Sequence, residues 1–374
     1  MVVQGAYQNL ETGQGKDPMM DLKKILIINP YGIGDVLFTT PIIRNLRMAY
    51  PKAFIAYLAN GRTADFLGAN RDLNKVFVYD RDLFVKAYRQ NPLTFWQKWL
   101  GLIHDIRRER FEVVFDLSLN STFGFLAWAG AIKKRIGYNY RGRGNFLNYA
   151  IALTGFEDKH VVDYFLDLLK FVEVPVMDRH LSLSIPAADI QWAREWLVKN
   201  KVDDAKPLVA VFPGGGASWG SQARYRLWGA ANYAHLVDKI IDNFDAAIIL
   251  LGDPKDEDLC REVARTARSQ VHVAVGQTSL WGLAALFKQC RTAVINDAGS
   301  VHMAVAVGLK AVSIYGPVDP NVYGPYPPEE HLTVGKGLPC QPCYRRFRMP
   351  ACSHISCLQD LSVDEVYRKV QGIL

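Results

Sequence analysis

Short runs of aliphatic and β-branched residues alternate with segments of helical periodicity along most of the chain, a pattern typical of parallel sheets covered by helices. The pattern occurs once before and once after a polar stretch at residues 186–206. The runs predict strands at residues 23–29, 53–58, 75–79 and 112–117, and again at 208–212, 246–251, 271–275, 292–295 and 311–314. We therefore expect an α/β fold with two Rossmann-like domains, whose parallel sheets face a central cleft.

The polar stretch also sets the expected domain boundaries. We predict a disordered extension at residues 1–21, with Met20 as a possible true start, and a first domain at 22–185. Residues 186–206 should form a helix and a polar linker, and residues 207–374 a second domain that ends in a cysteine-rich segment. The part of the linker near Lys201 to Pro207 is the expected hinge between the domains.

Composition and charge narrow the class of protein. Of 374 residues, 49% are hydrophobic and 22% charged, which is typical of soluble globular proteins. No apolar run is long enough to span a membrane, and the start lacks a signal-peptide core, so we expect a cytoplasmic protein. Residues 1–180 hold 24 of the 44 basic residues but only 18 of the 37 acidic ones. This asymmetry favours an anionic acceptor or membrane headgroups near the first half over a nucleic acid.

A glycine-rich turn follows the first predicted strand, at Gly32-Ile33-Gly34-Asp35-Val36-Leu37. It differs from a dinucleotide-binding fingerprint because Leu37 occupies the third glycine position, and because Asn60-Gly61-Arg62 follows the second strand in place of an acid. A nicotinamide cofactor is therefore disfavoured. The turn leaves Asp35 with two interpretations: a catalytic carboxylate directed into the cleft, or a helix cap.

Loops of the second half carry features suited to phosphate. Gly214, Gly215 and Gly216 follow the strand at 208–212, and Arg224 and Arg226 come next. Exposed backbone N–H groups with a nearby arginine suit a diphosphate, although a merely flexible turn explains the glycines equally well.

Two further strands end in acidic residues. Asp253 follows the strand at 246–251, where it could bind a nucleoside or cap a helix. Asp297 follows the strand at 292–295 and could hold a sugar hydroxyl. Gly299 and Ser300 would begin the next helix and offer N–H donors to phosphate. His302 is either a phosphate ligand or a buried core histidine.

Four cysteines lie within eighteen residues, at Cys340, Cys343, Cys352 and Cys357, with His354 between them. Such a cluster fits a structural metal such as zinc, reduced packing thiols or disulfides, and the spacing alone does not choose among these.

Together, the motifs resemble glycosyltransferases of the lipopolysaccharide ADP-heptose heptosyltransferase type, glycosyltransferase family 9, from Lys23 onward. The resemblance rests on the Gly32–Leu37 turn, Phe212-Pro213-Gly214, Arg226-Leu227-Trp228, Asp297–His302 and Gly316-Pro317-Val318-Asp319-Pro320. It implies a GT-B fold and metal-independent, inverting transfer of a heptose or related sugar from an ADP-sugar, without a cofactor. It further implies that Asp35 is the general base, that Arg226 meets the donor phosphates, and that Asp253 and the 297–302 segment contact the donor.

The resemblance also implies an anionic, lipid-linked saccharide acceptor bound by the first domain. We expect Gly34, Lys133, Arg135 and Arg141 to contribute to that site, because residues 117–156 hold five basic residues and no carboxylate. One helical face combines Phe95, Trp96, Trp99, Ile103 and Ile106. This face either contacts the inner membrane surface or packs into the core.

Two other functions fit the same residues. A sugar-nucleotide epimerase on this fold would use acids and a histidine around the anomeric carbon. A non-catalytic nucleotide- or glycan-binding protein would bind its ligand without needing Asp35.

Overall fold

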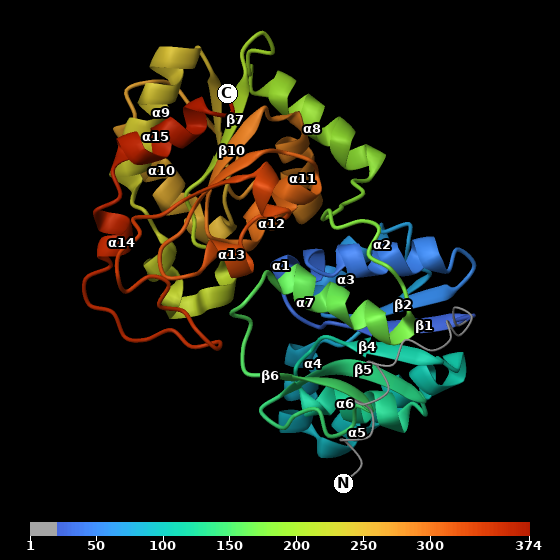
Figure 1. Ribbon diagram of the computed structural model, residues 1–374. Helices are drawn as coiled ribbons and strands as arrows, with labels where there is room; N and C mark the ends of the chain where they lie inside the picture. The colour runs from blue at the N-terminus through green and yellow to red at the C-terminus, as the bar shows by residue number, and fades with distance from the viewer. Residues whose placement is uncertain (1–20) are drawn as a thin grey trace.

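The computed structural model describes residues 21–374, and of Ala217–Ser221 it describes only the backbone. Of the extension expected at residues 1–21, only Asp21 is described. Met20, the possible true start, lies outside the described residues. In the described part of the chain, the strands form two six-stranded parallel sheets, one in each of two domains (Figure 1). The predicted fold class is confirmed.

The first sheet is built around strands that are apolar on both faces. β1 has the sequence KILII, and four of its five residues are buried, because helices cover both sides of the sheet. The strand order is β3 (Lys75–Val78), β2 (Phe54–Ala59), β1 (Lys24–Ile28), β4 (Val113–Asp116), β5 (Lys134–Tyr140) and β6 (Tyr149–Leu153).

Alternate residues of these strands face two different helical layers. Leu26 and Ile28 pack against the outer layer, which consists of α4 (Arg81–Gln90), α5 (Pro92–Glu109) and α6 (Ser121–Ala129). Ile25 and Ile27 face the second domain and pack against the inner layer. The inner layer consists of α1 (Ile33–Leu37), α2 (Thr40–Ala49), α3 (Gly61–Gly68), α7 (Val161–Asp167) and the 3₁₀ helix η1 (Leu168–Val172).

The second domain repeats this arrangement. Its strand order is β12 (Leu332–Val334), β11 (Ala311–Ile314), β10 (Thr292–Asn296), β7 (Leu208–Phe212), β8 (Ala247–Leu250) and β9 (His272–Val273). The outer layer holds α9 (Ala230–Phe244), α10 (Glu257–Thr266), α14 (Ser356–Gln359) and α15 (Val363–Gln371). The inner layer holds α8 (Ala187–Lys199), α11 (Leu280–Gln289) and α12 (Gly299–Ala306). Shorter helices are η2 (Ala217–Arg226), η3 (Pro254–Asp256), α13 (Pro320–Tyr323) and η4 (Pro328–Glu330).

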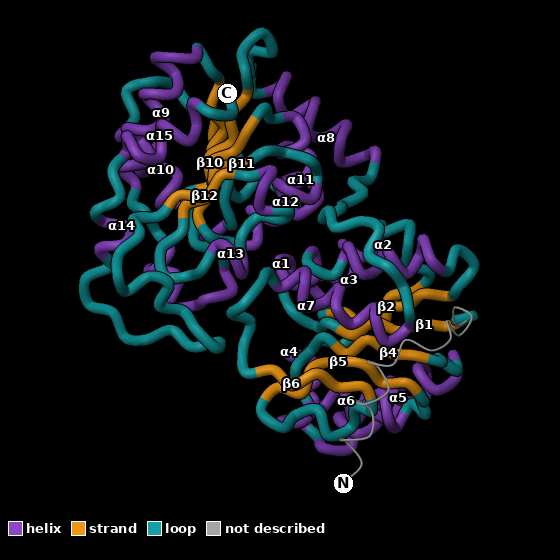
Figure 2. Tube along the Cα trace, viewed as in Figure 1, coloured by secondary structure: helices purple, strands orange, loops and turns teal. Residues whose placement is uncertain are grey.

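The inner helical layers of the two domains face each other (Figure 2), and one apolar core joins them. Polar contacts add to it: Tyr326 Oη donates to Asp163 Oδ1 at 2.7 Å, and His160 Nε2 lies 3.1 Å from the carbonyl oxygen of Gly324. The two domains are therefore held together along their inner layers, and the carboxyl ends of both sheets border the same space.

The chain crosses between domains before α8 rather than after it. Trp196 of α8 donates its indole N–H to Gln277 at 2.9 Å, and Trp192 packs against Gly282 of α11. Because α8 is attached to the second domain, Lys201 to Pro207 connect two elements of that domain. In the described chain the crossing between the domains lies between η1 and α8, and the hinge expected at Lys201 to Pro207 stays a prediction.

Three strands were not predicted: β5, β6 and β12. β5 begins with Lys134 and Arg135, and this part of the chain looked like a basic loop. β6 and β12 are edge strands, and only Leu153 in β6 and Val334 in β12 are buried. β6, with the sequence YAIAL, is apolar throughout and could have been predicted, whereas β12 has only three residues.

One face of α5 was expected either to contact the membrane or to pack into the core. In the structure, most of this face packs into the core. Trp99, Leu102 and Ile106 are buried against the sheet, and Phe95 and Ile103 are partly buried beside them. Trp96 differs, because 53% of its surface is exposed. No helix of the described chain combines the length and apolar character that crossing a bilayer requires.

Candidate active site

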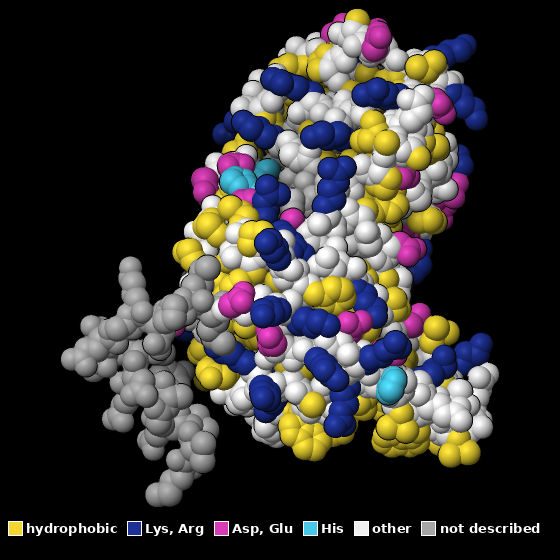
Figure 3. All heavy atoms as spheres, turned by 90° about the vertical axis from the view of Figure 1, so that its right-hand side faces the viewer, with side chains coloured by type: hydrophobic (Ala, Val, Ile, Leu, Met, Phe, Trp, Pro, Cys, Tyr) yellow, Lys and Arg dark blue, Asp and Glu magenta, His cyan; other side chains and the backbone are white. Residues whose placement is uncertain are grey.

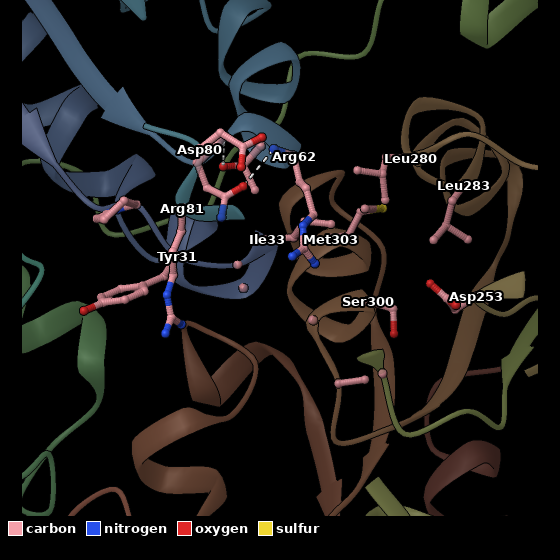
Figure 4. A pocket seen from close by; sticks show the side chains of 18 of the residues that line it. Tyr31, Ile33, Arg62, Asp80, Arg81, Asp253, Leu280, Leu283, Ser300 and Met303 are labelled. Carbon is pink, nitrogen blue, oxygen red and sulfur yellow. Dashed lines mark hydrogen bonds between the residues drawn. The ribbon is translucent and has the colours of Figure 1, made fainter. Parts of the chain in front are cut away.

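A cavity of about 880 Å³ lies between the domains, where the loops after the strands of both sheets meet (Figure 4). The first domain contributes the Tyr31–Gly34 turn after β1, Arg62 after β2 and Arg81 after β3. The second domain contributes Asp253 after β8 and the start of α12. This is the position at which open α/β sheets bind ligands.

The start of α12 forms one wall of the cavity. Gly299 and Ser300 both line it, as expected from the sequence. The hydroxyl of Ser300 is buried and has no hydrogen-bond partner among the described residues, and Figure 4 shows it beside Asp253. A buried hydroxyl without a partner is costly, and a ligand at the helix N-terminus would supply one.

The glycine loop after β7 contributes a different glycine from those expected. Gly216, with a φ of +75°, lines the cavity, whereas Gly214 and Gly215 are buried behind it. A Cβ atom on Gly214 would lie 2.1 Å from a carboxylate oxygen of Asp256. That carboxylate accepts the backbone N–H of Asp253 at 3.0 Å, so Gly214 shapes the loop that carries Asp253.

Arg226 and Asp297 form a buried ion pair. Arg226 Nε lies 3.2 Å from Asp297 Oδ2, and Nη1 donates to the Asp297 carbonyl oxygen at 2.9 Å. Burial lowers the pKa of Arg226 and raises that of Asp297, and each charge opposes the shift of the other. Neither side chain lines the cavity. Asp297 directly precedes Ala298 and Gly299 in the chain, so its pairing with Arg226 helps to fix the start of α12.

His302 is buried between the two domains. Its ring centroid lies 4.3 Å from that of Phe38, and a Cβ on Gly34 would lie 3.1 Å from His302 Cδ2. Burial lowers its pKa to about 3, so the imidazole is neutral at physiological pH. His302 does not line the cavity, but its buried Nδ1 has no hydrogen-bond partner among the described residues, so both interpretations of His302 stay open.

Asp35 lies in the first turn of α1 and does cap the helix: Oδ2 accepts the N–H of Gly32 at 3.2 Å. Its side chain is exposed and does not itself line the cavity, although Tyr31–Gly34 of the same turn do. Its charge raises the pKa of Tyr323 and Tyr344 from the second domain. Desolvation by the surrounding protein raises the pKa of Asp35 to about 6. Capping and catalysis are therefore compatible, because Gly32 donates to Oδ2 alone.

Tyr344 was not predicted, although it lies inside the cysteine-rich segment. Burial raises its pKa, Arg226 lowers it, and Asp35 and Asp297 raise it further. The phenol is thus close to the expected base and to the ion pair behind α12. Nearby, Phe347 packs edge-on against Tyr140 of the first domain at 5.2 Å, and Arg346 pairs with Glu157 at 3.1 Å. The segment therefore reaches across to the first domain.

The six cysteines, all within the described chain, have free thiols. Burial and the neighbouring thiols raise the pKa values of Cys343 and Cys357. Among the residues that the structure describes, no group of three or more histidine, cysteine or acidic side chains is arranged to hold a metal ion. Of the four clustered cysteines only Cys357 is buried, and their thiols lie close enough to affect one another's pKa, so the three alternatives stay open.

The structure does not bring the three expected acceptor cations into the cavity. Lys133 precedes β5, and Arg135 lies near its start, where Arg135 Nη1 donates to the Ile132 carbonyl oxygen at 2.6 Å. Arg141 follows the other end of β5 and stacks on Tyr140 at 5.0 Å. Gly34, in contrast, lines the cavity.

Comparison with known proteins agrees with this geometry. Residues 99–352, more than half of the chain, match the family described as glycosyltransferase family 9 (heptosyltransferase). The chain belongs to this family. It is 24% identical over 314 residues to lipopolysaccharide heptosyltransferase 2 of Salmonella typhimurium, with 81% of this chain and 85% of that protein covered.

Solved structures show the same fold. A family 9 glycosyltransferase from Veillonella parvula aligns with a TM-score of 0.77 at 20% identity, covering 96% of this chain and 99% of the other. The ADP-heptose lipopolysaccharide heptosyltransferase II of E. coli aligns with a TM-score of 0.71 at 19% identity, covering 94% and 98%. The chain is thus a glycosyltransferase of the heptosyltransferase family with the expected GT-B architecture.

In this family 9 enzyme, the described cations that line the cavity are Arg81 and Arg62, of which Arg62 pairs with Asp82 at 3.2 Å; sequence reasoning missed both. Arg62 follows the helix cap Asn60, and Arg81 follows the helix cap Asp80. Both arginines follow predicted strands, and this position could have marked them as candidate ligand-binding residues. In the sequence analysis, Asn60-Gly61-Arg62 was used only as an argument against a dinucleotide-binding fingerprint.

Proposed function

We propose that this enzyme transfers a heptose, with inversion, from ADP-heptose to an anionic, lipid-linked saccharide of the lipopolysaccharide core at the cytoplasmic face of the inner membrane. The observation that carries the proposal is the wall at the start of α12, where Gly299 and Ser300 line the cavity and the buried Ser300 hydroxyl has no hydrogen-bond partner among the described residues. The Asp35 turn approaches this wall closely: a Cβ on Gly299 would lie 3.5 Å from Gly34 N. Donor and acceptor sites would then adjoin between the domains.

The donor would occupy the half of the cavity formed by the second domain. Its diphosphate would accept hydrogen bonds from the backbone of Gly299 and from Ser300, where the helix dipole favours an anion. Asp253 would accept hydrogen bonds from the nucleoside. Arg226 and Asp297, held together behind the helix start, would keep those donors in place, and the positive charge of Arg226 would favour the diphosphate.

The acceptor would enter the half formed by the first domain. Arg62 and Arg81 line this half and would balance the acidic groups of the acceptor. Arg141 follows the carboxyl end of β5, at the same edge of the sheet, and could contact more distant parts of a large saccharide.

The chemical step follows from these positions. The acceptor hydroxyl attacks the anomeric carbon, the bond from that carbon to the diphosphate oxygen breaks, and ADP leaves with the bonding electrons. Asp35 takes the proton of the hydroxyl. A raised pKa makes this carboxylate a better base, while most of it stays ionised at neutral pH. Because attack occurs opposite the leaving group, one step inverts the anomeric configuration.

Transfer should be tested with purified enzyme, ADP-heptose and a de-O-acylated lipopolysaccharide core acceptor, with the product detected by mass spectrometry. We expect an acceptor heavier by one heptose, together with one ADP for each transfer. The variant Ser300→Ala should raise KM for the donor, because it removes a hydrogen bond to the diphosphate. ADP-heptose consumption without acceptor glycosylation would contradict the proposal, and so would transfer from UDP- or GDP-sugars alone.

A further inference from the structure

Tyr31 is an aromatic residue of the first domain that lines the cavity and has no part in the function proposed above. The aromatic residues that line the cavity differ in exposure. Phe123 and Phe212 are each 4% exposed, whereas Tyr31 is 40% exposed. Ligand pockets are lined mainly by hydrophobic and aromatic side chains, so an aromatic side chain that stays open inside the cavity is available to a ligand.

The hydroxyl of Tyr31 is held by the protein. It donates a hydrogen bond to the carbonyl oxygen of Ser118. Ser118 is fixed in turn by Asp116, whose Oδ1 accepts the Ser118 N–H at 3.0 Å and the Ser118 hydroxyl at 2.6 Å. Burial, with smaller contributions from Asp116 and Asp35, raises the pKa of Tyr31 to about 12, so the hydroxyl stays protonated and remains a donor. Because the hydroxyl already has a partner, a ligand would meet mainly the ring.

The hydrogen bond to Ser118 places Tyr31 where the strand order of the first sheet reverses. Tyr31 follows β1 and Ser118 follows β4. These two strands are neighbours, but the chain continues from β1 to β2 on one side and from β4 to β5 on the other. Open parallel sheets bind ligands in the crevice beyond two such strands. Asp35 lies in the first turn of α1, directly after Tyr31–Gly34, so a ligand against the ring would be next to the proposed base.

Two arginines lie near Tyr31. The charges of Arg143 and Arg81 are close enough to oppose the rise in its pKa. Arg81 begins α4 and lines the cavity, and Arg143 lies in the connection from β5 to β6. Neither arginine forms an ion pair with a carboxylate of the described chain. Both guanidinium groups are therefore available to acid groups of a ligand.

Position, and not positive charge as such, distinguishes these two arginines. The face of the molecule in Figure 3 carries many lysines and arginines interspersed with acidic and hydrophobic side chains. Figure 4 shows Arg81 next to Tyr31 on one side of the cavity, with Asp253 and Ser300 on the other. The ring and Arg81 thus belong to the half that we assign to the acceptor.

We propose that the ring of Tyr31 stacks against a sugar of the acceptor and positions the attacking hydroxyl of the saccharide beside Asp35. One face of a pyranose ring carries several C–H groups, which pack against an aromatic ring while the hydroxyls at its edge stay free to react. Arg81 and Arg143 pair with acid groups on the same part of the saccharide. The identity of the saccharide rests on the proposed function.

Steady-state kinetics of the full chain with ADP-heptose and a de-O-acylated lipopolysaccharide core test this role. Tyr31→Leu keeps an apolar side chain without a ring face. It should raise KM for the acceptor about tenfold or more and leave KM for ADP-heptose unchanged. Tyr31→Phe keeps the ring and should stay within about threefold of the wild type. The matched control is Tyr88→Leu, which removes a 60% exposed aromatic side chain of α4 outside the cavity and should change neither KM.

Three results would overturn the proposal, in variants shown by circular dichroism to be folded. The first is an unchanged KM for the acceptor in Tyr31→Leu. The second is an equal rise in Tyr31→Leu and Tyr31→Phe, because the hydrogen bond to Ser118 and not the ring would then be responsible. The third is a rise in KM for ADP-heptose alone, which would mean that the ring contacts the donor.

Calorimetric titration with the same saccharide, without donor, separates this proposal from the proposed function. Tyr31→Leu should bind the saccharide about tenfold or more weakly than the wild type and Tyr31→Phe do. If the wild type binds the saccharide but transfers no heptose to it, the proposed transfer fails, and the titration still decides the role of Tyr31. A wild type that does not bind the saccharide would overturn the role of Tyr31.

The salt dependence of the same titration tests the two arginines. Wild-type binding should weaken as salt is added, and the double variant Arg81→Gln, Arg143→Gln should respond less to salt. An equal salt dependence in the two proteins would overturn the pairing of these arginines with the saccharide.

Discussion

Two opposing effects act on the pKa of Asp35. Its carboxylate accepts the N–H of Gly32, which stabilises the ionised form, and the surrounding protein desolvates it, which has the larger effect and raises its pKa to about 6. The balance leaves a base that ionises just below physiological pH.

The substitution Asp35→Asn should abolish most turnover without unfolding the protein. The amide oxygen of the new side chain can still accept the N–H of Gly32, but it takes no proton, so kcat should fall by about 10²- to 10⁴-fold. KM for ADP-heptose and the melting temperature should change little. In the wild type, kcat/KM should fall as the pH drops below about 6, because protonation removes the base. A variant that keeps wild-type kcat would assign the proton transfer to another group.

Arg226 illustrates why loss of activity alone is a weak test of a buried residue. Removing it leaves the Asp297 carboxylate buried without its partner, so Arg226→Ala should lower the free energy of unfolding by about 3–5 kcal/mol. The double variant Arg226→Ala, Asp297→Ala removes both charges and should recover a large part of that loss. Denaturant unfolding of the two single variants and the double variant measures the coupling; additive effects would show that the pair contributes little.

At the scale of elements, apolar runs predicted strands best in the centre of each sheet. β1, β7 and β10 are covered on both faces, so their sequences are continuously apolar, and all three were predicted. β5 was missed because Lys134 and Arg135 interrupt its start. Sequence periodicity has a similar limit for α5. It identifies apolar faces of the helix, but only the three-dimensional packing shows which face contacts the sheet.

Only part of the cavity lining could be predicted from the sequence. Asp253, Gly299 and Ser300 were found because glycines or acids stood out after a strand. Arg62 and Arg81 were missed because Asn60 and Asp80 before them look like ordinary helix caps, and they do cap α3 and α4. Only the sheet order, which places β2 and β3 beside β1, shows that these loops border the same cavity.

A matched pair of leucines on α5 should show which face carries the packing. Leu102→Ala removes a side chain that is 8% exposed and should lower the free energy of unfolding by about 2–5 kcal/mol. Leu100→Ala removes one that is 61% exposed and should change it by less than about 0.5 kcal/mol. Both are measured by denaturant unfolding. Equal losses would mean that the exposed face of α5 is covered in solution.

At the scale of the whole molecule, the two domains share one apolar core but face a common cavity. The shared core couples their stabilities, because separating the inner layers would expose the side chains around Phe38 and His302 to water. We therefore expect closure around the donor to be a small rearrangement at the crossing before α8, with the shared core kept intact.

This coupling predicts how ADP should affect thermal unfolding. If the shared core makes unfolding cooperative, calorimetry should show one transition for both domains, and ADP should raise its temperature as a whole, although we place the nucleotide mainly against the second domain. At a concentration of about 100 times Kd, a ligand bound only by the folded protein stabilises it by about 2.7 kcal/mol, which corresponds to a few degrees for a chain of this size.

The control is Ser300→Ala, which should keep the single transition but show a smaller shift with ADP, because it removes one hydrogen bond to the diphosphate without disturbing the shared core. Two resolved transitions, of which ADP moves only the one from the second domain, would show that the domains unfold independently. Closure would then be free to separate the inner layers, and the Gly34–Gly299 approach would belong to only one of the conformations that the enzyme adopts.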